Sequence, residues 1–201
     1  MSEARENLVR RLPPGPHGIP PELVERNQRE RLIAAMAEVS SECGYAESTV
    51  AEISKRAGVS TASFYRQFKD RRACMLVSFE ELFGRLLGEV EGACNGEMER
   101  EAKVRAGVGT AAVLLAADPP TARLLTVEIV AVGLEGVRLQ HDAIEQLATR
   151  LREAHEHGAA LAKLPSAEWT VVVAMVALVS RRTAEGESAS VAELEAICKH
   201  L

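Results

Sequence analysis

Residues 49–72 of this chain read TVAEISKRAGVSTASFYRQFKDRR, the pattern of two short helices joined by a glycine turn. Thr49 can cap the first helix, and Glu52, three residues later, can complete a capping box. Gly58 suits the left-handed backbone at the point where a helix ends and the chain turns sharply. Ser60 then follows as a cap for the next helix. The stretch therefore predicts a helix-turn-helix.

The second helix of this pair carries small polar, aromatic and basic side chains, which we expect to be exposed: Thr61, Ser63, Tyr65, Arg66 and Lys69. Such groups can reach phosphates and base edges in the major groove of DNA. Ala62, Phe64 and Phe68 are expected to face inward. Arg66 is the strongest candidate for a base contact, because a guanidinium can read guanine through two hydrogen bonds.

With its flanks, this segment resembles the tetracycline-repressor (TetR) family of transcriptional regulators. The resemblance extends from the helix near residues 26–43 to the helix that starts near Arg71. It rests on three motifs in a fixed order: Gly44-Tyr45, Ala57-Gly58-Val59-Ser60 and Phe64-Tyr65-Arg66-Gln67-Phe68-Lys69-Asp70. Many relatives carry glycine, arginine or lysine followed by threonine or alanine where this chain has Thr61-Ala62-Ser63. This leaves fewer long donors in the helix.

The resemblance implies an all-α fold with an N-terminal three-helix helix-turn-helix DNA-binding domain and a C-terminal helical ligand-binding and dimerisation domain. Thr49, Tyr65 and Lys69 match positions that hold phosphates in the family. Contacts near the bases are expected from Ser60, Thr61, Ser63 and Arg66. A structural interpretation of Tyr65 stays open, as a half-buried ring beside Phe64 and Phe68.

Composition agrees with a helical DNA-binding protein. Aromatic residues make up 3% of the 201 residues, and no stretch alternates polar and apolar residues long enough to require a sheet. The formal charge of −5 is unevenly distributed. Residues 1–72 hold 12 Lys and Arg against 10 Asp and Glu, whereas residues 73–201 hold 12 against 19. The N-terminal part is therefore the more favourable for phosphate.

The expected domain limits are a proline-rich arm over residues 1–24, the helix-turn-helix domain over 25–72 and the helical domain over 73–201. Five of the eight prolines lie between residues 10 and 21, so no helix can run through that part. The arm is either disordered or places Arg10 and Arg11 in a neighbouring minor groove.

Other classes of protein find little support. The chain has no Gly-x-Ser-x-Gly, phosphate loop, dinucleotide fingerprint or metal-ligand cluster, so we expect neither catalysis nor a metal nor a cofactor. The apolar run from Trp169 to Val179 has 11 residues, short of the ~20 that cross a bilayer, which favours a cytoplasmic protein. Four widely spaced cysteines are expected to be buried reduced thiols, with a redox switch as the alternative: Cys43, Cys74, Cys94 and Cys198.

Proline, glycine and capping residues mark the ends of the remaining expected helices. One helix covers residues 21–43 and the next is capped by Asp70. The others cover residues 97–117, Asp118 through 131, the break at 133–136 to about 157, 167 to about 184, and 191–201. The helix after Asp70 has a glycine every fourth residue at Gly84, Gly88, Gly92 and Gly96. This spacing suits either a hinge or close packing against a neighbouring helix.

The family resemblance also implies a pocket for a small-molecule effector. The candidate ligand-binding residues are Leu114, Leu125, Glu128 and Ile129, although the apolar residues in this stretch are typical of an ordinary core. Glu128 either hydrogen-bonds the ligand or pairs with Arg123.

The helix over residues 167–184 is apolar on all sides, which favours a partner surface. We place the interface of a homodimer at Trp169, Val172, Val173, Val176 and Val179. A two-fold dimer would read a pseudo-palindromic operator in double-stranded DNA. The sequence thus favours a repressor released by a small hydrophobic ligand, with activation open. The alternative is a ligand-binding dimer whose helix-turn-helix contacts another protein rather than DNA.

Overall fold

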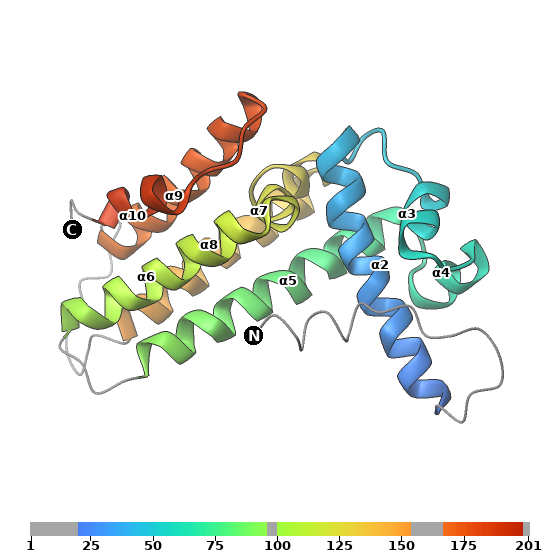
Figure 1. Ribbon diagram of the computed structural model, residues 1–201, viewed down its shortest axis with the longest axis horizontal. Coiled ribbons are helices and arrows are strands. Elements are labelled where there is room, and N and C mark those ends of the chain that lie inside the picture. The colour runs from blue at the N-terminus through green and yellow to red at the C-terminus, as the bar shows by residue number, and fades with distance from the viewer. Residues whose placement is uncertain (1–19, 96–99, 154–166, 199–201) are drawn as a thin grey trace. The chain divides into compact units, whose positions relative to one another are not determined.

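The computed structural model describes residues 20–95, 100–153 and 167–198, which form helices and turns without a strand (Figure 1). The all-α prediction is confirmed. These residues divide into two compact units, with the division between Ser78 and Phe79. The limits 25–72 and 73–201 stay a prediction, and the arm lies almost wholly outside the described residues.

The N-terminal unit contains α2 (Pro21–Cys43), α3 (Val50–Ala57), α4 (Thr61–Gln67) and the start of α5 (Arg71–Cys94). The bounds predicted for α2 are confirmed. Its proline lies in the first turn, where no intrahelical N–H is needed, and the helix ends at Gly44 with φ 82°. The core consists of large side chains from all four elements: Leu32, Ile33, Met36, Ile53, Phe64, Phe68 and Met75.

Local caps hold the helix-turn-helix in the way that the sequence predicts. The Thr49 hydroxyl accepts a hydrogen bond from the Glu52 N–H at 3.2 Å, and the Glu52 carboxylate accepts one from the Thr49 N–H at 3.0 Å. Gly58 adopts the left-handed conformation at φ 62° and ψ 38°. Asp70 caps α5 by accepting from the Ala73 N–H at 2.7 Å. Each boundary therefore has its own chemical cause.

Two arginines connect separate elements of this unit. The Arg56 guanidinium joins α3 to α2 through Glu38 at 3.0 Å and Glu42 at 2.6 Å. Its hydrogen bond to Glu42 lowers the pKa of that carboxyl below its ordinary value. Arg71 donates to the carbonyl oxygen of Ala46 at 3.0 Å and lies 4.5 Å from the ring centre of Tyr45.

The C-terminal unit continues α5 and adds α6 (Arg100–Ala117), α7 (Pro119–Thr126), the 3-10 helix η1 (Glu128–Val132), α8 (Leu134–Glu153), α9 (Ala167–Ala184) and α10 (Val191–Cys198). Its core draws on the six helices α5 to α10, with Val90, Val108, Leu151, Met175 and Leu194 among the buried side chains. Asp118 caps α7 as predicted, by accepting from the Thr121 N–H at 3.1 Å.

Two predicted boundaries in this unit are wrong. The helix expected from Asp118 through Ala131 ends at Thr126, and the chain continues as η1. The break expected at residues 133–136 is confined to Gly133, whose φ of 102° disfavours any other residue. Gly136 instead lies in the first turn of α8, where it allows a close approach. A Cβ at this position would lie 1.9 Å from the carbonyl oxygen of Ile129 in η1.

The described glycines of α5, unlike Gly136, do not lie at a close contact. A Cβ added at Gly84, Gly88 or Gly92 would meet no atom of the described chain within 4 Å. The close packing that the spacing suggested is therefore not made by these three residues, and Gly96 lies outside the described residues.

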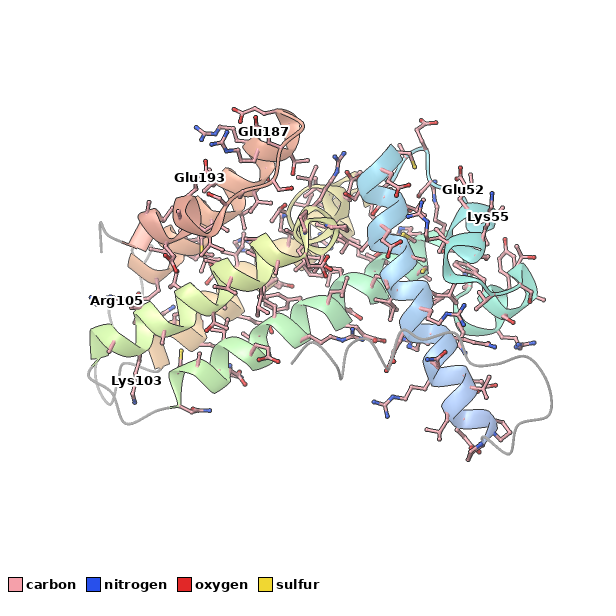
Figure 2. All side chains as sticks on the ribbon, in the orientation of Figure 1. Glu52, Lys55, Lys103, Arg105, Glu187 and Glu193 are labelled. Atoms are coloured by element: carbon pink, nitrogen blue, oxygen red, sulfur yellow. The ribbon has the colours of Figure 1, made fainter. Side chains whose placement is uncertain are left out.

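Arginine also fastens α10 to α9. The Arg182 guanidinium donates to Glu193 at 2.8 Å and to Glu187 at 2.9 Å, two acids labelled in Figure 2. Glu193 closes a capping box by accepting from the Ser190 N–H at 3.0 Å. These hydrogen bonds lower the pKa of Glu193 to about 2, so the carboxylate stays ionised at neutral pH.

The cysteines are only partly as predicted. Cys74 and Cys94 are buried, whereas Cys43 is exposed because it is the last residue of α2. Burial raises the pKa of the Cys74 thiol to about 12. The side chain of Cys198 lies outside those described. None of the described helices has the length and apolarity needed to span a bilayer.

The Gly136→Ala variant tests the contact between α8 and η1. Because its methyl group would overlap a backbone oxygen, we expect the free energy of unfolding to fall by about 2 kcal/mol. The matched variant Gly88→Ala lies in an open stretch of helix and should raise it by about 0.5–1 kcal/mol. Urea unfolding followed by circular dichroism measures both. Equal stability of Gly136→Ala and the wild type would contradict the contact.

Candidate nucleic-acid interface and internal cavity

The orientation of α4 is set by its aromatic side chains. Phe64 is completely buried, and Phe68, which follows the helix, is nearly so. Their ring centres lie 5.6 Å apart, and the Arg29 guanidinium lies 5.0 Å from the centre of the Phe68 ring. Because seven residues make only two turns, these two anchors decide which side chains of α4 face outward.

The outward face of α4 differs from the prediction at two positions. Thr61, Tyr65, Arg66 and the following Lys69 are exposed as expected. Ala62, expected to face inward, is exposed as well. Ser63, expected to be exposed, is buried with 7% of its surface accessible. The exposed set follows the i, i+1, i+4, i+5 spacing opposite Phe64, so Ser63 lies on the inner side.

Tyr65 packs on one side and is accessible on the other. Its ring lies edge-on to Phe64, with centres 5.5 Å apart and an interplanar angle of 83°. The side chain is nevertheless 58% exposed. The packed ring therefore holds its hydroxyl group on the accessible surface of α4.

Hydrogen bonds connect three predicted DNA-contact residues. The Ser60 hydroxyl accepts from the Ser63 N–H at 3.0 Å and donates to the Ser63 hydroxyl oxygen at 3.0 Å. The same oxygen accepts from Arg66 Nη2 at 2.9 Å. The first turn of α4 is thus linked to the arginine in its last turn.

Thr49 is less available for a contact with a DNA phosphate than the sequence indicated. Its hydroxyl donates to Glu52 at 2.7 Å, in addition to the two bonds of the capping box. A phosphate at this position would have to share Thr49 with a carboxylate. Lys55, one turn beyond Glu52 on α3, is exposed and was missed as a candidate cation (Figure 2). The short helix gave no pattern that distinguished Lys55 from the engaged Arg56.

The C-terminal unit contains a cavity of about 50 Å³ that is partly open to the surface. Side chains from α5 to α9 line it: Phe79, Phe83, Leu86, Ala111, Leu115, Leu125, Thr126, Gln140, Ala143, Ile144, Leu147, Val172, Met175 and Val176. Its two polar residues are engaged elsewhere. Thr126 donates to the Ala122 carbonyl oxygen at 2.8 Å, and Gln140 donates to the carbonyl oxygen of Thr126 at 2.8 Å. The cavity therefore offers an apolar surface.

Of the four predicted ligand residues, Leu125 alone is in this lining. Leu114 is half-buried, Ile129 is fully buried and Glu128 is 4% exposed, all three outside it. Glu128 accepts a hydrogen bond from Arg123 Nε at 2.7 Å, so the predicted pairing is confirmed. The aromatic lining of α5 was not predicted, although Phe79, Phe83 and Leu86 have the spacing of a single helical face.

The structure also locates the predicted dimer residues. Val172 and Val176 line the cavity, Val179 is buried in the core, and Trp169 packs against the core. Val173 is half-buried. The apolar character of α9 is thus largely used within its own unit. Other large apolar side chains of this unit are exposed at Val113 of α6, at Val130 of η1, and at Leu134 and Val137 of α8, the last two 66% and 46% exposed.

Residues 32–76, which include the helix-turn-helix, match the family described as bacterial regulatory proteins, tetR family. The fatty acid metabolism regulator protein of Bacillus subtilis (strain 168) is 28% identical over 111 residues, covering 55% of this chain and 57% of that protein. The matched part of the chain thus spans little more than half the length of that relative.

Solved structures share the fold over most of the chain. The fatty acid degradation regulator FadR from Bacillus halodurans has a TM-score of 0.72 at 21% identity, covering 94% of this chain and 95% of that one. FadR from Bacillus subtilis in complex with stearoyl-CoA has a TM-score of 0.69 at 20% identity, covering 85% and 95%. At these identities the likeness establishes the fold.

Proposed function

We propose that this chain, which belongs to the TetR family of bacterial regulatory proteins, is a sequence-specific DNA-binding transcriptional regulator. The observation that carries the proposal is α4, which is anchored by Phe64 and presents an exposed arginine, tyrosine and small side chains on one face. A helix with this surface fits the major groove, and its arginine matches the hydrogen-bond acceptors of guanine.

The exposed residues suggest a division of roles. Arg66 would read guanine, whereas the methyl groups of Thr61 and Ala62 suit contact with the methyl group of thymine. Tyr65 and Lys69 would contact phosphates, which position the protein without reading sequence. Because the net positive charge of residues 1–72 is small, DNA affinity would depend on these specific contacts more than on the overall charge.

We further propose a homodimer that uses the outward face of α8. Leu134 and Val137 supply exposed apolar surface, and Arg138 and Glu145, seven residues apart, are exposed with opposite charge. If two copies of α8 pair antiparallel about a point between residues 141 and 142, Arg138 of each copy meets Glu145 of the other. A two-fold interface makes this contact twice. Such a dimer would read a pseudo-palindromic operator.

The proposed effector is a long-chain acyl-CoA, and the proposed direction of control is repression relieved by that ligand. The cavity is apolar, and one structurally similar FadR was solved with stearoyl-CoA. Sites for ligands of such size usually have about 300–1,000 Å³. Because the cavity has about 50 Å³, the acyl chain requires its lining to move apart. Phe79 and Phe83 of the lining lie on α5, whose first residues belong to the N-terminal unit.

Selection from random duplex DNA tests the central proposal. The wild type should enrich a two-fold symmetric motif. Arg66→Ala should weaken binding to that motif by ~1–3 kcal/mol per half-site and relax the preference at one position. Arg105→Ala, which removes an exposed charge from α6, is the matched control and should leave the preference unchanged. A folded wild type that enriches nothing at low salt would favour the protein-binding alternative.

Charge reversal tests the dimer. Arg138→Glu and Glu145→Arg each place like charges together at two symmetric positions, so each should weaken dimerisation by on the order of tenfold. The double variant restores opposite charges and should recover the wild-type dissociation constant in sedimentation equilibrium. Arg105→Glu serves as a control for net charge. Failure of the double variant to recover would contradict the antiparallel pairing of α8.

Ligand release tests the effector. Stearoyl-CoA should dissociate the protein from its selected duplex, whereas CoA and acetyl-CoA should not, because they lack the long apolar chain. Ala143→Leu places a larger side chain in the cavity lining and should weaken the response by about tenfold. Ala117→Leu, at an exposed position on α6, should respond normally. A wild-type response from Ala143→Leu would exclude this cavity as the acyl site.

A further inference from the structure

Three polar residues in and just before α4 are connected at a spacing of three: Ser60 before the helix, Ser63 in its first turn and Arg66 in its last. The Ser63 hydroxyl oxygen accepts from Ser60 Oγ at 3.0 Å and from Arg66 Nη2 at 2.9 Å. A hydroxyl oxygen has two acceptor lone pairs, and both are used here. The side chain is also buried. Ser63 therefore lacks the exposure that a base contact needs, and its acceptor lone pairs are already occupied within the protein.

Arg66 has the opposite properties. Its side chain is exposed, and the bond to Ser63 uses one of the five N–H donors of the guanidinium group. Guanine requires two donors, at O6 and N7. The bond to Ser63 thus leaves enough donors for reading guanine while it fixes one nitrogen of the group.

Arg66 also differs from Arg56 in the charge of the group that accepts its hydrogen bond. Arg56 is held by the carboxylates of Glu38 and Glu42, which compensate its charge. The Arg66 guanidinium is held by a neutral hydroxyl. A neutral anchor restricts the side chain without supplying the negative charge that would compete with DNA. An arginine that is already ordered loses less conformational entropy when it binds.

We infer that Ser63 is a positioning residue, which with Ser60 orients the Arg66 guanidinium for guanine and does not itself contact a base. The inference rests on the proposed DNA-binding function. It makes the Ser63 hydroxyl a determinant of specificity at the base pair that Arg66 reads.

A double-mutant cycle on the full chain tests this inference with the selected duplex and its single-base variants. Ser63→Ala should weaken binding about three- to tenfold, the effect of one hydrogen bond, and reduce the preference for guanine at the position that Arg66 reads. In the Arg66→Ala background, the same change should alter binding by less than about twofold. Thermal unfolding should show that Ser63→Ala keeps the stability of the N-terminal unit.

Ser54→Ala is the matched control. Ser54 is a buried serine of α3 whose hydroxyl has no hydrogen-bond partner among the described residues. Its removal should leave affinity and base preference unchanged. Equal losses from Ser63→Ala in both backgrounds, or no loss in either, would overturn the positioning role.

A measurement without DNA separates this inference from the proposed function. Nuclear magnetic resonance relaxation of Arg66 Nε should show an ordered side chain in the wild type and a disordered one in Ser63→Ala. Equal disorder in both would overturn the inference even if DNA is bound. A wild type that is ordered at Arg66 but binds no duplex would overturn the proposed function and the reading of guanine with it.

Discussion

Burial of Phe64 is the constraint on which the DNA-binding surface depends. A helix of seven residues is too short to be stable alone, so α4 exists because its aromatic face packs against α2 and α3. Once that ring is fixed, the helical period determines every other position. Arg66 faces outward and Ser63 inward for the same reason, and the hydroxyl of Ser63 then lies within reach of the guanidinium. One apolar contact thereby sets the chemistry on the opposite face of the helix.

Local signals in the sequence predicted the helix-turn-helix well. The capping box of Thr49 and Glu52, the left-handed Gly58 and the cap by Asp70 depend on residues three or four positions apart, so the sequence contains the whole interaction. The prediction was wrong for Ser63, which is buried, and for Ala62, which is exposed, and this shows the limit of such reasoning. Two turns of helix carry too few residues for a period to be read reliably, and the packing of Phe64 and Phe68 settles their orientation.

The cavity could not be predicted because five helices contribute to its lining. Leu114, Leu125, Glu128 and Ile129 are near one another in sequence, whereas the lining combines Phe79, Ala143 and Val172 from distant segments. The apolar surface of α9 takes part in the same space. Val172 and Val176 line the cavity, so part of the hydrophobicity of α9 has a use inside the unit, and the interface predicted on this helix stays a prediction.

Gly136 gives the C-terminal unit an unexpected mechanical property. Its missing side chain lets α8 approach the carbonyl oxygen of Ile129, and η1, which contains that oxygen, is joined to α7 through Glu128 and Arg123. The joint at Gly133 is therefore braced on both sides. We expect a tilt of α8 to move η1 and α7 with it, because both contacts join η1 to its neighbours.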